Sequence, residues 1–165
     1  RKHPPEGDYA PPQGGNFAWR LNLAATALPM QQHWRDVAAG PQQARADSGG
    51  DPVLMRKDGA IAYHLACVLD DDAQGVTLVT RGADLIESTP LQRLLQQLLA
   101  LPEPAYLHHG LLLDESGRRL AKRDQAATLA ALRAAGANGD DVRRQFVRQC
   151  APLLAQAGLA LRETP

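Results

Sequence analysis

The densest group of basic side chains lies between Arg118 and Arg123, where four of six residues are arginine or lysine. This run follows a predicted turn at Glu115–Gly117. A loop that carries several cations beside a sheet edge could bind a polyphosphate, and Lys122 would be a compact charge able to follow phosphate oxygens during a nucleotidyl step. A solvated basic hairpin is the structural alternative, because charged surface turns are common.

Tyr63 and Arg81 form a second candidate pair. Arg81 follows the β-branched run Val76–Thr80, and the carboxyl end of a strand is where α/β folds bind ligands. The planar guanidinium of Arg81 suits a carboxylate, and the hydroxyl of Tyr63 could add a neutral hydrogen bond. The structural alternative places Tyr63 in the core and pairs Arg81 with a surface carboxylate such as Asp84.

A third group consists of the acidic residues Asp70–Asp72 at the end of a predicted helix, with Cys67 one turn earlier. Carboxylates here could accept hydrogen bonds from a substrate ammonium or a ribose, or hold a magnesium ion. A solvated acidic turn is the alternative, although acidic residues near a helix C-terminus are slightly unfavourable. Cys67 faces either the core or this pocket, and Cys150 is expected to be buried.

The five histidines show no spacing typical of metal ligands, and His108 and His109 are expected to pack and form hydrogen bonds. The 18 basic and 18 acidic residues cancel, so the composition gives no support for broad attraction to nucleic acid. The 165 residues, 44% of them hydrophobic, suit one domain with a real core. We find neither a signal peptide nor a long uncharged apolar run, which predicts a soluble cytoplasmic protein.

Helices that alternate with strands predict the α/β class. Gly75 and Gly136 should cap helices, Thr89 with Pro90 should begin one, and Pro152 should bend or divide the last. The helix that begins at Thr89 should carry leucines along one face, at positions 91, 94, 95, 98 and 99. Residues 24–50 are expected to be irregular. The predicted strands are Phe17–Leu23, Val53–Lys57, Val76–Thr80 and Tyr106–Leu113, and the predicted helices are Ala62–Gln74, one from Thr89 to before Pro102, about Thr128–Ala135 and about Asp140–Ala157.

The order of these motifs resembles the glutamyl-tRNA synthetase group of class I synthetases over roughly residues 17–136. Each segment alone is weak, but their joint order is specific. The matching segments are Val53–Gly59, Tyr63–Ala66, Val68–Asp71, Gly75–Thr77, Arg81–Leu85, Ser88–Pro90 and Arg119–Arg123.

The resemblance implies roles for single residues. The family's "KMSKS" loop stands here as Arg119-Leu120-Ala121-Lys122-Arg123, and its ATP-contacting second lysine corresponds to Lys122. The family's tyrosine and arginine that hold glutamate correspond to Tyr63 and Arg81. Ala121 and Arg119 depart from the usual Ser and Lys. Asp70, Asp71 and Cys67 are further candidates for the pocket.

The resemblance also implies an incomplete catalytic core. The family's "HIGH"-like motif and its zinc-ligating cysteines have no counterpart in these 165 residues. We therefore expect residues 1–16 to be a loop from a longer protein, 17–123 the C-terminal part of a Rossmann-type core, and 124–165 a short helical segment. We also expect the 165 residues alone to be inactive.

The short C-terminal segment resembles the glutamyl-queuosine branch of the family. This branch implies an intact parent that uses ATP with Mg²⁺ to activate L-glutamate and esterifies the queuosine base of tRNA(Asp). The sequence does not reveal the oligomeric state, and a monomer is the favoured expectation. Zinc in the parent is an open expectation. Two alternatives remain: a fragment of an ordinary synthetase that charges tRNA(Glu), and a non-catalytic module that binds tRNA or a protein.

Overall fold

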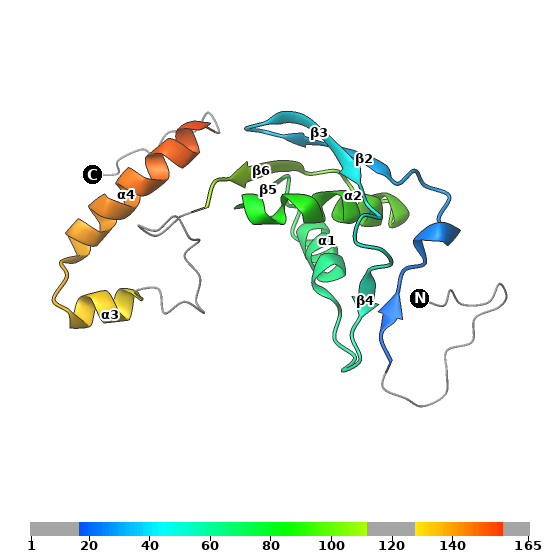
Figure 1. Cartoon of the computed structure of the whole chain (residues 1–165), viewed down its shortest axis with the longest axis horizontal. Coiled ribbons are helices and arrows are strands. Elements are labelled where there is room, and N and C mark those ends of the chain that lie inside the picture. Colours follow the sequence, from blue (N-terminus) through cyan, green and yellow to red (C-terminus); the bar gives the residue numbers. More distant parts are fainter. Residues whose placement is uncertain (1–16, 112–127, 157–165) are drawn as a thin grey trace.

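The computed structural model describes residues 17–111 and 128–156 (Figure 1). The predicted loop 1–16, the basic run 118–123 and the expected ends of the last strand and the last helix lie outside these residues. The strands are β1 (Trp19–Arg20), β2 (Gln31–Asp36), β3 (Gly40–Arg45), β4 (Val53–Met55), β5 (Leu78–Gly82) and β6 (Ala105–His109). The helices are η1 (Leu23–Ala25), α1 (Tyr63–Ala73), η2 (Ala83–Ser88), α2 (Thr89–Leu98), α3 (Leu129–Ala134) and α4 (Gly139–Gln156).

The strands form two sheets. β1 and β4 make a small antiparallel pair, and the larger sheet has the order β3-β2-β6-β5. β2 and β3 are an antiparallel hairpin, whereas β5 and β6 run parallel and β6 joins the hairpin through a parallel pair between Asp36 and Tyr106. The mixed sheet with its helices confirms the predicted α/β class, and the parallel pair places the ends of β5 and β6 at one edge.

Helix α2 lies against β2 and β3 of the larger sheet, and α1 packs on α2 (Figure 1). In α2, the residues from Gln92 to Gln96 are all buried, and three of them have polar side chains. Leu98 and Leu99 are 39% and 43% exposed, so the predicted leucine face is wrong at its C-terminal end. Because Gln92, Arg93 and Gln96 are buried together with Leu94 and Leu95, burial of α2 is not confined to its leucine face.

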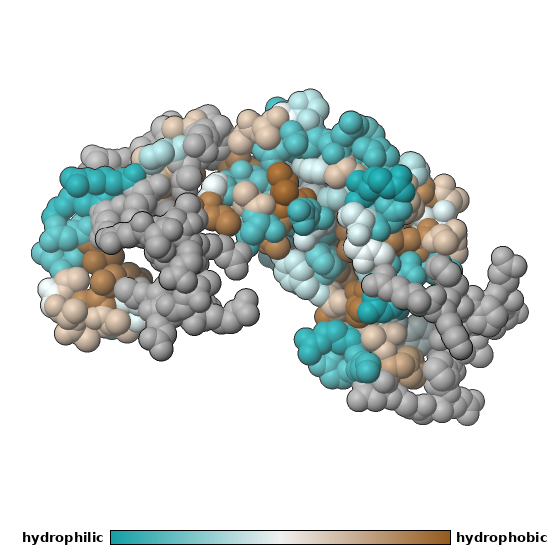
Figure 2. Space-filling model, in the orientation of Figure 1, coloured by the Kyte–Doolittle hydropathy of each residue, from teal (hydrophilic) through white to brown (hydrophobic). Residues whose placement is uncertain are grey.

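One core cluster lies where the start of the chain meets α2. Leu23, Ala46 and Leu94 are buried together, with partly buried Leu21 and Met30 packed against them. Figure 2 shows hydrophilic side chains over the β2–β3 hairpin and apolar ones gathered below it.

The β2–β3 hairpin corrects the expectation that residues 24–50 are irregular. Gln32, Trp34 and Asp36 alternate as buried positions along β2, with exposed residues between them. Because two of the three buried side chains are polar, the period-two burial leaves no apolar alternation in the sequence. The strand predicted over Phe17–Leu23 is likewise reduced to the two residues of β1.

The helix signals were mostly correct. α1 lies within the predicted range, and Gly75 and Gly136 have φ of 66° and 82°. Thr128 caps α3 by accepting a hydrogen bond from the Ala131 amide at 3.1 Å, and Pro152 lies inside one continuous α4. α2 begins at Thr89 without a side-chain cap, so the predicted capping role of Thr89 is wrong.

Candidate functional site

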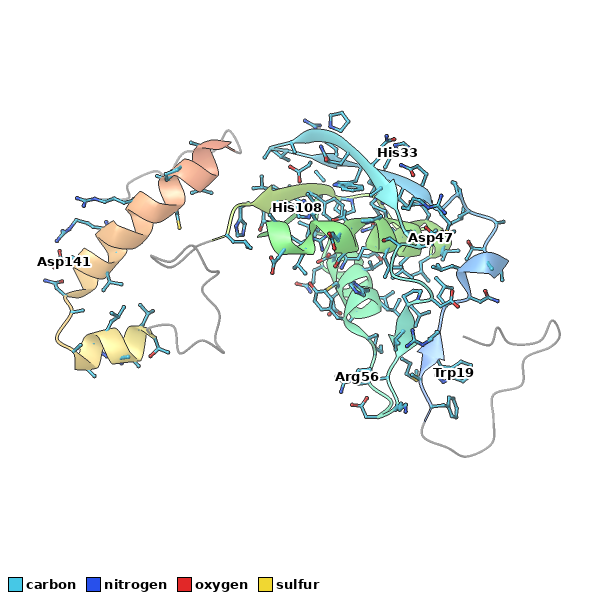
Figure 3. The ribbon with its side chains drawn as sticks, viewed as in Figure 1. Trp19, His33, Asp47, Arg56, His108 and Asp141 are labelled. Carbon is cyan, nitrogen blue, oxygen red and sulfur yellow. The ribbon has the colours of Figure 1, made fainter. Side chains whose placement is uncertain are left out.

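Arg81 lies near the carboxyl end of β5, directly beside His108 of β6. The parallel register pairs these two residues, and it pairs Val79 with Tyr106 two positions earlier. Residues two apart on a strand share a face, so Arg81 and Val79 stand on one side with His108 and Tyr106. Figure 3 shows His108 near the middle of the main body, where β6 passes α2.

Three hydrogen bonds hold the guanidinium of Arg81. Its Nε donates to Nε2 of His108 at 3.0 Å, one terminal nitrogen donates to Oε1 of Gln92 at 2.5 Å, and the other donates to Oγ1 of Thr89 at 2.6 Å. The guanidinium carbon also lies 5.1 Å from the centre of the Tyr106 ring. The predicted alternative of a simple surface ion pair does not describe this residue, because α2 and β6 fix its orientation.

Asp36 at the end of β2 fixes His108 from the other side. Its Oδ2 lies 2.6 Å from Nδ1 of His108 and accepts a bond from the His108 backbone N–H at 3.2 Å. Its Oδ1 accepts bonds from the backbone N–H groups of Ala38 and Ala39, both at 2.9 Å. Asp36 is 1% exposed, so these bonds satisfy a carboxylate that solvent does not reach.

The electrostatics of this group favour an ionised Asp36 beside a neutral His108. Burial alone would raise the pKa of Asp36, but the bonds from Ala39 and His108 outweigh it and leave the pKa below its ordinary value. Burial lowers the pKa of His108, and the positive charge of Arg81 lowers it further, against the opposing effect of Asp36. The imidazole is therefore neutral near pH 7.

Two side chains of α1, one at each end of the helix, feel the charge of Arg81. Burial raises the pKa of Tyr63, a hydrogen bond with Cys67 raises it further, and the charge of Arg81 opposes the shift. The pKa of Asp71 is raised by burial and by Asp70, again against Arg81. Arg81 therefore interacts electrostatically with both Tyr63 and Asp71.

Tyr63 is 52% exposed, which excludes the alternative that it is a core residue. Its ring meets the ring of His64 edge to face at 5.3 Å. Burial and the charge of Arg81 lower the pKa of His64. Cys67 and Cys150 are both partly buried, so the expectation of a buried Cys150 is wrong. An exposed tyrosine hydroxyl can contribute a neutral hydrogen bond to a carboxylate.

The predicted polyphosphate loop, with Arg119, Leu120, Ala121, Lys122 and Arg123, lies outside the described residues. Its role stays a prediction. Within residues 17–111 and 128–156, no group of three or more His, Cys, Asp or Glu side chains could hold a metal ion. In the same parts of the chain, no helix has the length and apolar character to cross a membrane.

The sequence did not point to the buried polar face of α2, from which Thr89 and Gln92 hold Arg81. Thr89, Gln92, Arg93 and Gln96 recur at the three- and four-residue steps of one helical face, and all four are buried. That polar periodicity was the available signal, but the leucines of the same helix dominate its pattern. Asp36 gave no signal, because it follows a strand without apolar alternation.

Comparisons with known proteins agree with the predicted resemblance. Residues 13–156 match the family described as tRNA synthetases class I (E and Q), catalytic domain. A glutamyl-Q tRNA(Asp) synthetase of Rhodobacter capsulatus is 47% identical over 131 residues, which cover 76% of this chain and 46% of the relative. The protein of the same name from Nocardia farcinica is 55% identical over 130 residues, which cover 79% of this chain and 40% of the relative.

Solved structures support the same relationship. A glutamate tRNA ligase from Elizabethkingia meningosepticum, crystallised in complex with its amino acid, matches with a TM-score of 0.51 and 30% identity over 57% of this chain and 19% of that one. The glutamate-tRNA synthetase of Elizabethkingia anophelis matches with a TM-score of 0.51 and 31% identity over 59% of this chain and 20% of its own.

The chain spans less than half the length of these curated relatives. The family match nevertheless covers most residues of this chain, including every element around Arg81. On this match, the chain belongs to the class I tRNA synthetases of the glutamate and glutamine type and carries part of their catalytic domain.

Proposed function

We propose that the intact protein containing this chain activates L-glutamate with ATP and transfers it to the queuosine base of tRNA(Asp). The observation that carries the proposal is the guanidinium of Arg81, which three hydrogen bonds fix at the carboxyl end of β5. The charge of Arg81 also acts on the pKa of Tyr63. The names of the similar glutamyl-Q tRNA(Asp) synthetases support the choice of acceptor.

The chemistry is an in-line displacement. The α-carboxylate of glutamate attacks the α-phosphorus of ATP, the bond to the β-phosphate breaks, and pyrophosphate leaves with its electron pair. Catalysis comes from positioning and charge stabilisation. ATP with Mg²⁺ enters as a substrate, and the resemblance assigns the stabilisation of the departing pyrophosphate to Lys122.

The role of Arg81 is to distinguish the side-chain carboxylate of glutamate from the α-carboxylate that reacts. A guanidinium binds a carboxylate through two parallel N–H donors, and Arg81 has more such donors than its three acceptors use. Arg81 and Tyr63 would hold the side-chain carboxylate, which leaves the α-carboxylate free to react. This division of roles explains selection of glutamate over an uncharged analogue.

The test is Arg81→Ala in the intact protein, assayed by glutamate-dependent exchange of pyrophosphate into ATP. Loss of a charged partner should raise KM for glutamate about a hundredfold or more and change KM for ATP little. Arg56→Ala is the matched control, because Arg56 forms an exposed ion pair with Asp58 at 2.7 Å beyond β4, away from His108 in Figure 3. Unchanged glutamate kinetics in Arg81→Ala would reject the role of Arg81.

A second candidate acceptor is tRNA(Glu), because the solved structures similar to this chain are glutamate-tRNA ligases. Parallel charging assays separate the two. We expect the intact protein to esterify tRNA(Asp) that carries queuosine and to leave both tRNA(Glu) and queuosine-free tRNA(Asp) uncharged. Charging of tRNA(Glu) alone would replace the proposed acceptor.

A further inference from the structure

The three hydrogen-bond acceptors that orient Arg81 are all uncharged. They are the Nε2 of His108, the amide oxygen of Gln92 and the hydroxyl oxygen of Thr89. Neutral acceptors fix the direction of a guanidinium without forming an ion pair with it. The negative charge of Asp36 stands one imidazole ring away, on the far side of His108.

This arrangement requires one tautomer of His108. Nε–H of Arg81 can only donate, so Nε2 of His108 must present its lone pair. The single ring proton of the neutral imidazole then lies on Nδ1 and is donated to the carboxylate of Asp36 at 2.6 Å. The tautomer of a histidine is set by the hydrogen bond that its other nitrogen makes.

The two oxygens of Asp36 have separate tasks. Oδ1 accepts the backbone N–H groups of Ala38 and Ala39 and so holds the turn between β2 and β3. Among the residues that the structure describes, Oδ2 accepts from His108 alone, through the ring and the backbone. A change confined to Oδ2 can therefore alter the imidazole while it leaves the turn bonds in place.

We propose that Asp36 and His108 are positioning residues for Arg81: Asp36 holds His108 in the tautomer that accepts from Arg81, and thereby sets the direction in which the guanidinium meets its carboxylate substrate. This inference rests on the proposed role of Arg81 in binding glutamate. It adds a residue of the β2–β3 hairpin to a site otherwise built from β5, β6, α1 and α2.

Asp36→Asn tests the proposal with one atom exchanged. The amide oxygen can keep the turn bonds, and the amide NH₂ then faces Nδ1 of His108 as a donor and no longer accepts from the His108 backbone N–H. Nδ1 must become the acceptor, the ring proton moves to Nε2, and Nε2–H opposes Nε–H of Arg81. KM for glutamate should rise about tenfold to a hundredfold, as expected for a hydrogen bond to a charged group, and KM for ATP should change little.

Nitrogen NMR of protein labelled with ¹⁵N-histidine reads the tautomer directly, because protonated and unprotonated ring nitrogens have distinct chemical shifts. We expect the proton on Nδ1 of His108 in the wild type and on Nε2 in Asp36→Asn. Asp51→Asn is the matched control, since Asp51 accepts from the Leu23 amide at 3.1 Å outside this network. It should leave both the tautomer and KM unchanged.

Two variants of His108 extend the test should Asp36→Asn fail to fold. His108→Gln can place an amide oxygen near the position of Nε2 and accept from Arg81, whereas His108→Asn is too short to do so. We expect KM for glutamate to stay within a fewfold of the wild type for Gln and to rise for Asn. Equal kinetics for these two variants would overturn the proposal.

The outcomes also separate this inference from the proposed function. A proton found on Nε2 in the wild type overturns the positioning role, as does a changed tautomer in Asp36→Asn with unchanged glutamate kinetics. If Arg81→Ala itself leaves glutamate binding intact, the proposed function fails instead. A changed tautomer with a selective rise in KM for glutamate supports both.

Discussion

At the scale of single residues, the uncharged state of His108 determines how Arg81 is held. The ring lies parallel to that of Tyr106, with centroids 6.0 Å apart, and its side chain is 3% exposed. A protonated ring would place a second cation beside Arg81 and would lose the lone pair that Nε–H requires. Burial and the nearby guanidinium both act against that protonation.

This protonation behaviour predicts a pH dependence of stability. The pKa values of His108 and His64 are lowered in the folded chain, so the unfolded chain takes up protons first as the pH falls below the ordinary value of 6.5. The free energy of unfolding should therefore decrease on acidification below about pH 6.5 and change little above it. Urea unfolding at about pH 7.5 and about pH 5.5 measures this difference.

The matched comparison is His108→Gln, which removes one of the two titrating groups. Its stability should fall less steeply over the same pH range. Asp36 acts in a more acidic range, because its lowered pKa means that its contribution is lost only below about 3.8. A wild-type chain that becomes more stable on acidification toward pH 5.5 would contradict the assignment of neutral histidines.

At the scale of elements, α2 acts as a polar support beneath the sheet. Arg93 donates to the carbonyl of His33 at 3.2 Å, hydrogen-bonds to Gln96 and pairs with Glu103 at 2.7 Å. Gln96 in turn donates to the hydroxyl of Tyr106 at 3.1 Å. The same helix thus anchors β2 and β6 by its second turn and orients Arg81 by its first.

The C-terminus of α2 allows a stabilising substitution. Ala100 has a φ of 54°, a left-handed conformation that a side chain disfavours, and it follows the helix where glycine is common. Ala100→Gly should raise the free energy of unfolding by about 1 kcal/mol, measured by urea denaturation. Ala66→Gly within α1 is the control and should lower it by about 1 kcal/mol. Destabilisation by Ala100→Gly would show that this conformation carries no strain.

At the scale of the whole molecule, the chain carries the proposed glutamate site on part of a class I synthetase catalytic domain. The site residues come from β2, β5, β6, α1 and α2. The relatives are more than twice as long as the matched segments, and these 165 residues contain no counterpart of the "HIGH"-like motif. We therefore predict that ATP binding needs residues of the longer parent protein.

The 165-residue chain on its own should show no glutamate-dependent exchange of pyrophosphate into ATP. The intact parent protein is the positive control and should catalyse the exchange under the same conditions. Exchange by the isolated 165 residues would show that the ATP-binding elements do not require the longer sequence. That result would point to the basic run around Lys122 as the ATP-binding segment of the chain.

The sequence was sufficient where a local rule applied. Gly75 and Gly136 marked helix ends, and the β-branched run Val76–Thr80 placed Arg81 at the carboxyl end of a strand. The sequence was insufficient where the buried side chains are polar. Gln32 and Asp36 are buried on β2, and Gln92 and Arg93 are buried on α2. Such residues carry no hydrophobic pattern, because their partners come from distant segments and are found only after folding.

The positions of the Arg81 acceptors in the sequence also limit the order in which its hydrogen bonds can form during synthesis. Its acceptors follow it along the chain by 8, 11 and 27 residues, and Asp36 precedes His108 by 72. Closing a loop of that span costs entropy before its contacts repay it. While the ribosome extends the chain, Arg81 therefore lacks His108 as an acceptor until β6 has been synthesised and has docked beside the hairpin. β6, the last described strand of the sheet in chain order, thus completes the hydrogen bonds of Arg81.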